Sequence, residues 1–192
     1  MSRVEALLAQ MTLEEKIAQI VSFWDKGDGE AVAPLQGQFS GEDDDLASVT
    51  PHGLGHLTRP YGTRPVDPAE QAKWLWDQQR RVIAKTPHKI PMLVHEEALN
   101  GLSVWGAATF PVPLSWGAAM DPDLVARMAE LIGNSMKELG VHQALAPVLD
   151  VIRDPRWGRD EENYGEDPFL AGTLGVQFVR GFQGEITPST PY

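Results

Sequence analysis

Carboxylates and arginines are concentrated in one short stretch of the sequence. Residues 150–168, DVIRDPRWGRDEENYGEDP, contain seven carboxylates, three arginines and one tryptophan, and they follow the apolar run ALAPVL at 144–149. Carboxylates accept hydrogen bonds from the hydroxyls of a sugar, a guanidinium donates to them, and an indole packs against the C–H face of the ring. Glycoside hydrolysis also uses a pair of carboxyl groups. The stretch therefore predicts a carbohydrate site.

A second polar stretch, HEEALNG at 95–101, follows the apolar run IPMLVH at 90–95. A helical zinc site would require a second histidine four residues after His95, but Leu99 occupies that position. We therefore expect no metal here. Nor do we expect a cofactor, because carboxyl groups alone can carry out acid–base chemistry on a glycosidic bond.

Other functional classes lack support in the sequence. GLGHLT at 53–58 lacks the third glycine of a dinucleotide-binding loop, and no Gly-x-Ser-x-Gly elbow is present. The net charge of −11 disfavours nucleic acid and anionic lipid surfaces as partners. The sequence has neither a long apolar run nor a signal-like N-terminus, so we expect no membrane segment and a cytoplasmic location.

The elements that must position these residues begin with a helix. Thr12 and Glu15 form a capping box, and apolar residues at helical spacing predict a helix that continues to Trp24. Residues 25–48 are rich in glycine and acid, which predicts a long loop. The expected organisation is an opening helix and acidic loop over 1–50, followed by the first strand–helix units over 51–192.

A pattern of strand, loop and helix then occurs three times. Apolar runs at 53–58, 90–95 and 144–149 predict strands, and each is followed by an Asp-Pro pair that predicts a helix start: Asp67-Pro68, Asp121-Pro122 and Asp167-Pro168. Aspartate caps the free N–H groups of the first turn, and proline fits the first helical position. Gly140 and Gly184 are expected to end the second and third helices.

Alternating strands and helices predict an α/β fold with parallel strands. Three strand–helix units cannot close a (β/α)₈ barrel, so we expect the N-terminal part of a TIM-type barrel: about three units plus an N-terminal helix. Loops that leave the carboxyl ends of parallel strands share one face. Residues 95–101 and 150–168 should therefore lie on that face.

The stretch DVIRDPRWGRDEENYGEDPFLAG closely resembles the D-x-x-R-D-P-R-W-G-R-x-x-E-x-x-x-E-D-P motif of glycoside hydrolase family 3, the family of β-glucosidases and β-xylosidases. Shorter stretches resemble the same family in the same order: MTLEEKIAQI, GLGHLTR, TFPVPLSWGAAMDPDL and VRGFQG. The resemblance covers nearly the whole chain. It implies a barrel domain and exo-acting hydrolysis with retention of configuration.

The resemblance also implies roles for two residues. Glu97, four positions before Gly101, matches the acidic residue that binds hydroxyls of the terminal sugar, and Arg159, in WGR, matches an arginine that binds the same sugar. It places the family's Lys-His pair, its nucleophilic aspartate and its acid/base glutamate beyond this chain. We therefore expect substrate-binding residues here but no catalytic ones.

The remaining polar residues have structural interpretations. Arg153, Asp154 and Arg156 are expected to form ion pairs that hold the loop, and Glu162 and Glu166 to support arginines or helix ends. Trp157 fits either a loop anchor, which we favour, or a platform for sugar. His95 and Glu96 are expected to orient Glu97 or to meet solvent.

Three functional hypotheses follow. The first is an N-terminal fragment of a retaining β-glycosidase that acts on β-glucosides or β-xylosides and is inactive alone. The second is a non-catalytic sugar-binding or scaffold protein derived from that family. The third is one half of a split enzyme, whose partner is the missing C-terminal part.

Overall fold

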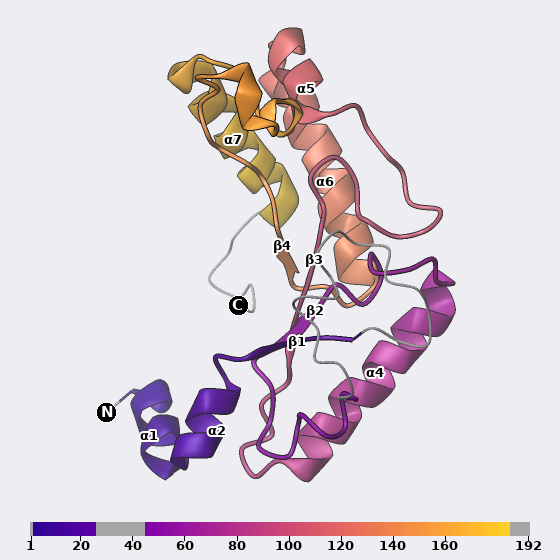
Figure 1. Cartoon of the computed structure of the whole chain (residues 1–192), viewed down its shortest axis with the longest axis vertical. Helices are drawn as coiled ribbons and strands as arrows, with labels where there is room; N and C mark the ends of the chain where they lie inside the picture. The colour runs from indigo at the N-terminus through magenta and orange to yellow at the C-terminus, as the bar shows by residue number, and fades with distance from the viewer. Residues whose placement is uncertain (1, 26–44, 185–192) are drawn as a thin grey trace. The chain divides into compact units, whose positions relative to one another are not determined.

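The computed structural model describes residues 2–25 and 45–184 as an α/β fold around a parallel sheet of order β1-β2-β3-β4 (Figure 1). The chain divides into two compact units: unit 1 contains Met1–Glu96 and Leu139–Gln143, and unit 2 contains Glu97–Glu138 and Ala144–Tyr192. The predicted α/β class is confirmed. Most of the predicted acidic loop, and the tail from residue 185, lie outside the described residues.

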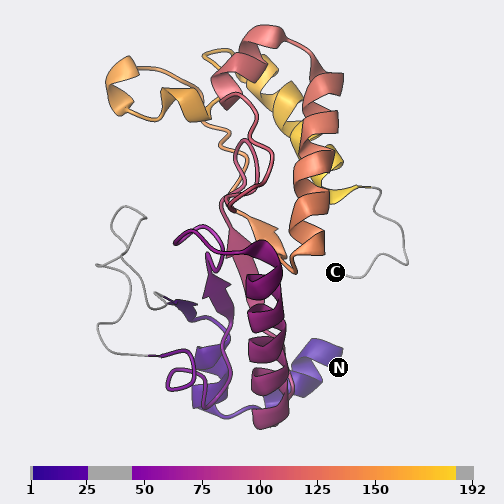
Figure 2. The same ribbon diagram turned by 90° about the vertical axis from the view of Figure 1, so that its right-hand side faces the viewer.

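Unit 1 is built on three parallel strands, β1 (Ser22–Trp24), β2 (His56–Thr58) and β3 (Leu93–Glu96). Leu57 and Val94 are paired in register and have no exposed surface. Helix α4 (Pro68–Lys85) runs along this sheet in both views (Figures 1 and 2) and begins, as predicted, at a cap in which Asp67 accepts from two N–H groups. Burial of apolar side chains between helix and sheet thus holds unit 1 together.

The side chains of Gln79 and His142 form hydrogen bonds with backbone groups in and just before β3. The buried amide of Gln79 donates from Nε2 to Met92 O at 2.7 Å and accepts from Met92 N at 2.9 Å. His142 donates from its backbone N to Val94 O at 2.8 Å, and its Nδ1 accepts from Val94 N at 3.0 Å. Both contacts satisfy backbone groups that would be costly to bury unpaired.

The N-terminal segment differs from the prediction. The capping box of Thr12 and Glu15 is present, but helix α2 covers only Leu13–Ala18, and the residues that follow form β1. A separate helix, α1 (Arg3–Gln10), precedes α2. The predicted helix to Trp24 is wrong because the chain after Ala18 bonds to the segment around β2: Gly55 N donates to Ala18 O, and His56 N to Val21 O. Pairing with a distant segment overrides the local helical spacing.

Unit 2 consists of helices α5 (Pro113–Ala119), α6 (Pro122–Glu138) and α7 (Pro168–Gln183), with α6 and α7 side by side in both views (Figures 1 and 2). The predicted starts of α6 and α7 are confirmed, since Asp121 accepts from Leu124 N and Asp167 from Phe169 N. In the described part of the chain, no helix combines the length and the apolar character needed to cross a bilayer.

The third predicted strand is much shorter than expected. Strand β4 contains only Gln143–Ala144, and residues 145–149 are irregular. Pro147 lies within this segment and has no N–H group to donate to a neighbouring strand. The chain therefore leaves the sheet early and enters the charged stretch as an extended loop.

Helix α5 packs directly on the charged stretch. Trp116, Tyr164 and Phe178 are almost fully buried, with ring centroids 6.4 Å apart for Trp116 and Tyr164 and 6.2 Å for Trp116 and Phe178. A Cβ atom on Gly117 would lie 1.9 Å from the carbonyl oxygen of Tyr164. The backbones approach so closely that only glycine fits at position 117.

We therefore expect Gly117→Ala to lower the free energy of unfolding by about 2 kcal/mol, because a helix or a loop must shift to make room. Urea denaturation followed by circular dichroism measures this change. Gly172→Ala in α7 is the matched control, since an added Cβ meets no atom within 4 Å there and helix propensity alone should raise stability by about 0.5–1 kcal/mol. Parent-like stability of Gly117→Ala would contradict the close packing.

Candidate functional site

The candidate site lies on the charged loop, residues 150–167, which leads from β4 to α7. Ile152 N donates to Gly165 O at 3.1 Å, which closes the base of the loop. Two 3₁₀ turns, Pro155–Trp157 and Asp160–Glu162, shape its outer part. Asn163 is fully buried and donates from Nδ2 to Arg159 O at 2.7 Å. This hydrogen bond from the buried Asn163 side chain therefore holds the backbone at Arg159 in place.

The guanidinium of Arg159 is held by a fork of two hydrogen bonds to one carboxylate. Its Nε donates to Glu162 Oε1 at 3.0 Å and its Nη2 to Oε2 at 2.5 Å. The hydrogen bond from Arg159 lowers the pKa of Glu162, and the same contact raises the pKa of Arg159. The predicted supporting role of Glu162 is confirmed. The Arg159 side chain remains 54% exposed, so its remaining donors can reach a ligand.

Glu97 belongs to the same unit as Arg159. It opens the Glu97 loop, residues 97–110, in which Glu97 O accepts from Ser103 N at 2.9 Å. Reciprocal bonds between Asn100 and Phe110, of 2.8 and 2.7 Å, close this loop. After Glu162, the negative charges of Asp150 and Glu97 also raise the pKa of Arg159. The charge of Glu97 thus contributes to the electrostatic environment of the Arg159 guanidinium.

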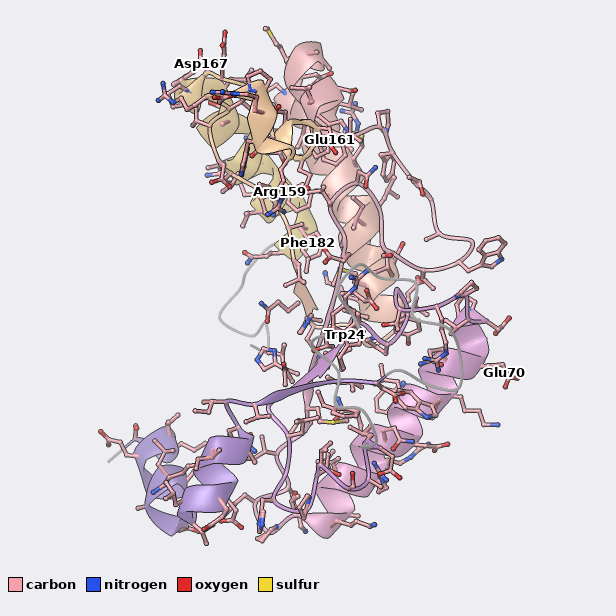
Figure 3. The ribbon with its side chains drawn as sticks, in the orientation of Figure 1. Trp24, Glu70, Arg159, Glu161, Asp167 and Phe182 are labelled. Carbon is pink, nitrogen blue, oxygen red and sulfur yellow. The ribbon has the colours of Figure 1, made fainter. Side chains whose placement is uncertain are left out.

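A second arginine pair lies on the same loop. Arg156 donates from Nε to both oxygens of Asp154, at 2.9 and 3.1 Å, and its Nη2 also contacts Asp154 Oδ2. The predicted ion pair is confirmed for these two residues, whereas Arg153 lines a surface hollow together with Trp157. The Arg156 side chain is 87% exposed, so the pair stabilises the fold only weakly. Figure 3 labels Arg159 and Glu161, which both belong to this loop.

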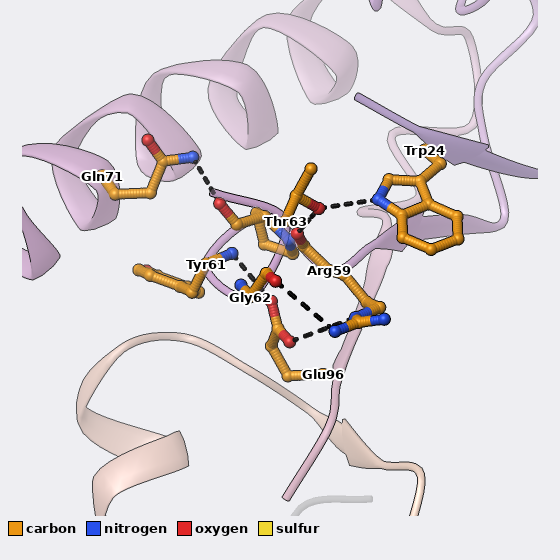
Figure 4. Close-up of polar contacts among 8 residues, drawn as sticks. Trp24, Arg59, Tyr61, Gly62, Thr63, Gln71 and Glu96 are labelled. Atoms are coloured by element: carbon orange, nitrogen blue, oxygen red, sulfur yellow. Dashed lines mark hydrogen bonds and ion pairs between the residues drawn. The ribbon is translucent and has the colours of Figure 1, made fainter. Parts of the chain in front are cut away.

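Glu96 has a structural role in the interior of unit 1. Its carboxylate is fully buried, and its Oε1 accepts from Tyr61 N and from Gly62 N, each at 2.7 Å (Figure 4). It therefore does not meet solvent, and that alternative of the prediction is wrong for this residue. Burial, followed by the charge of Glu96, raises the pKa of the Tyr61 phenol to about 12. Glu96 is a structural acceptor for the loop that follows β2.

Sequence reasoning missed Arg59, which links the ends of three strands. Its Nε lies 4.0 Å from Glu96 Oε2, and its guanidinium carbon Cζ lies 5.3 Å from the centroid of the Trp24 ring (Figure 4). The backbone φ of Arg59 is 45°. Trp24 Nε1 donates to Thr63 Oγ1 at 2.6 Å, and Thr63 Oγ1 donates to Arg59 O at 2.6 Å. The position of Arg59, immediately after a predicted strand, was the available signal.

The histidine before Glu96 belongs to the same strand ends. His95 Nδ1 lies 3.5 Å from His56 Nδ1, and burial, the charge of His56 and that of Arg59 lower the pKa of His95. His95 is therefore a neutral imidazole at pH 7. Over residues 2–25 and 45–184, no three histidine, aspartate or glutamate side chains are grouped so that they could hold a metal ion.

The Arg159–Glu162 fork makes a testable prediction about pH. Because the folded pKa of Glu162 is lowered, the fork stabilises the fold above the unfolded-state pKa of about 4.3, and this contribution is lost as pH falls through the folded pKa. Carboxyl-carbon NMR titration should show that Arg159→Ala raises the Glu162 pKa toward about 4.3. The control Arg156→Ala should raise the pKa of Asp154 instead. If the pKa of Glu162 is the same in Arg159→Ala as in the parent, the two residues do not form the fork in solution.

Comparison with known proteins assigns the family. Residues 12–190 match the glycosyl hydrolase family 3 N terminal domain. A β-xylosidase of Formosa agariphila is 39% identical to this chain, in an alignment that covers 50% of this chain and 14% of the relative. β-Glucosidase C of Emericella nidulans is 31% identical, in an alignment that covers 95% of this chain and 29% of the relative. A solved β-glucosidase from Erythrobacter marinus has 29% identity and a TM-score of 0.79 over 98% of this chain and 24% of its own.

The chain thus spans about a quarter of the length of the relatives that it matches along nearly all of its own. The structural similarity to the Erythrobacter enzyme confirms that the strand–helix units of this chain are the N-terminal part of a TIM-type barrel. The carboxylate and arginine motifs and the fold lead to one conclusion: this chain belongs to glycoside hydrolase family 3, as an N-terminal domain of the β-glucosidase and β-xylosidase type.

Proposed function

We propose that this chain supplies the sugar-binding front part of an exo-acting, retaining β-glycosidase of β-glucosides or β-xylosides. In this proposal Glu97 and Arg159 bind hydroxyls of the terminal sugar. The observation that carries it is the Arg159 guanidinium, held in a fork by Glu162 and within the electrostatic reach of Glu97. The names of the relatives, β-glucosidase and β-xylosidase, support the substrate class.

The chemistry of the two side chains suits a neutral polyol. A carboxylate only accepts hydrogen bonds and a guanidinium only donates them, so together they match both sides of a pair of vicinal hydroxyls. Hydrogen bonds to charged groups contribute about 1.5–3 kcal/mol each. Because Glu162 and the Asn163 contact already fix Arg159, little further ordering is needed when a sugar binds.

We further propose that the nucleophile and the acid/base residue lie outside this chain, which would then not hydrolyse glycosides by itself. The family resemblance places both groups in later segments, and the chain spans only 23–29% of two relatives that it matches over 95% of its length. Its partner in catalysis is then the remaining part of the same enzyme. A sugar-binding protein without catalytic function would bind the same ligands but would need no such partner.

Arg159 and Arg156 provide a matched pair for testing the sugar-binding role. Both donate to a carboxylate on the same loop, but the charge of Glu97 contributes to the raised pKa of Arg159 and is not among the causes of the raised pKa of Arg156. Isothermal titration of D-glucose and D-xylose should show that Arg159→Ala weakens binding roughly 10- to 100-fold, because a charge-assisted hydrogen bond is lost. Arg156→Ala should bind like the parent and lose only a little stability. Equal affinity of the Arg159→Ala variant and the parent would refute the assignment.

Catalytic incompetence is tested separately. The purified chain, incubated with aryl β-glucoside and aryl β-xyloside, should release no more phenol than buffer, because retaining hydrolysis requires two positioned carboxyl groups. Arg159→Ala purified in parallel controls for contaminating enzyme. Turnover that the parent shows and the variant lacks would place the catalytic groups within this chain.

A further inference from the structure

We propose that His142 is a pH-sensitive joint, which releases residues 139–143 from strand β3 when its imidazole is protonated. Residues 139–143, here called the joint segment, follow α6 in the chain, lead into β4 and belong to unit 1. The proposal concerns contacts inside unit 1 alone. None of its residues has a role in sugar binding, so the inference goes beyond the proposed function and is tested without a sugar.

His142 is attached to β3 by two hydrogen bonds to a single residue. Its backbone N donates to Val94 O at 2.8 Å, and its ring Nδ1 accepts from Val94 N at 3.0 Å. The imidazole thus takes the place that a backbone carbonyl of a neighbouring strand would have in a regular sheet. Val94 has no exposed surface, so its N–H group depends on the imidazole for a partner.

The hydrogen bond from Val94 N fixes the protonation state of His142, because a backbone N–H group can only donate. Nδ1 must offer a lone pair, and the ring is therefore the neutral tautomer that carries its proton on Nε2. An imidazolium carries protons on both nitrogens and cannot accept a hydrogen bond. Protonation would thus set two N–H groups against each other, and the ring would have to move away from β3.

The surroundings of the ring also disfavour a positive charge. The imidazole lines a hollow together with uncharged residues only: Leu75, Trp76, Gln79, Ile83, Pro91 and Gly140. His142 as a whole residue is exposed, but its Nδ1 faces the buried backbone of Val94. Burial of this part of the ring lowers the pKa of His142, and no neighbouring charge contributes to the shift. The neutral form is therefore the one that the fold favours.

Other titratable groups near the joint segment have different partners. On β3, the imidazole of His95 lies beside that of His56, and the carboxylate of Glu96 accepts from the loop after β2. The Tyr61 phenol donates to Leu139 O at 2.7 Å, and with a pKa of about 12 it keeps its proton in neutral and acidic solution. The first residue of the joint segment therefore stays attached, and only the part around the imidazole is released.

The direction of the pH effect follows from the lowered pKa. The contact of neutral His142 with Val94 stabilises unit 1 fully above the unfolded-state pKa of about 6.5. This contribution is lost as pH falls through the folded pKa. Mild acid should therefore loosen the joint segment while β2 and β3 remain paired.

Hydrogen exchange followed by NMR on the whole chain tests the joint at single amides. The protection factor of the Val94 amide, corrected for the intrinsic pH dependence of exchange, should fall about tenfold between about pH 7.5 and about pH 5, as expected for one lost hydrogen bond. The Leu93 amide donates to Gly55 O, toward β2, and is the internal control. Its protection should stay the same.

His142→Asn is the matched variant, because its Oδ1 can accept from Val94 N but does not titrate in this range. Protection of the Val94 amide should then be independent of pH, whereas His142→Ala should show low protection at both pH values. His88→Asn, at a histidine that pairs with Glu15, should retain the pH dependence of the parent. Circular dichroism establishes that each variant is folded.

The inference is overturned if Val94 in the parent is equally protected at both pH values. It is also overturned if His142→Asn shows the same fall, which would assign the effect to another group such as His95, or if Leu93 and Val94 lose protection together, which would mean that unit 1 opens as a whole. If His142→Asn does not fold, nitrogen NMR of the parent ring decides: a proton on Nδ1 of His142 at neutral pH excludes the joint, and a proton that arrives there as Val94 loses protection supports it.

Discussion

The contact between Gly117 and the Tyr164 carbonyl is the constraint on which the candidate site depends. Helix α5 follows the Glu97 loop in the chain, and Tyr164 belongs to the charged loop that carries Arg159. Trp116 adds an aromatic contact with Tyr164 beside the point of closest approach. The two loops are thus tied through one helix. Close-packed interiors transmit small displacements, so a shift at Gly117 would be passed to the charged loop through Tyr164.

Carboxylates that look alike in the sequence have different roles in the structure. Glu96 is buried and satisfies two backbone N–H groups, whereas its neighbour Glu97 is half-buried and acts electrostatically on Arg159. Asp154 and Glu162 each hold an arginine. Glu96, Asp154 and Glu162 therefore each have a structural partner. The opposite charges of the loop hold irregular backbone in place, and this leaves a guanidinium exposed in a fixed orientation.

The sites differ in how far local sequence could reveal them. The fork of Arg159 and Glu162 joins residues three apart, and the pair of Arg156 and Asp154 joins residues two apart. The sequence predicted ion pairing around Asp154 and a supporting role for Glu162, because opposite charges so close in the chain can meet within one loop. The contacts of Glu96 with Tyr61 and Gly62 span 35 and 34 positions, and Trp24 meets Thr63 across 39. No local pattern marks such contacts, because parallel strands bring together segments that a whole helix separates.

The sequence by itself determined the α/β class, the family, and the helix starts at Asp67, Asp121 and Asp167. Capping depends on residues within one turn, and the family motif is continuous. Only the tertiary structure decided that the segment Ser22–Trp24 is a strand and that β4 ends at Ala144. It alone also placed Glu96 in the interior. These features arise from pairing and burial between distant segments, whose free energies exceed the local preferences along the chain.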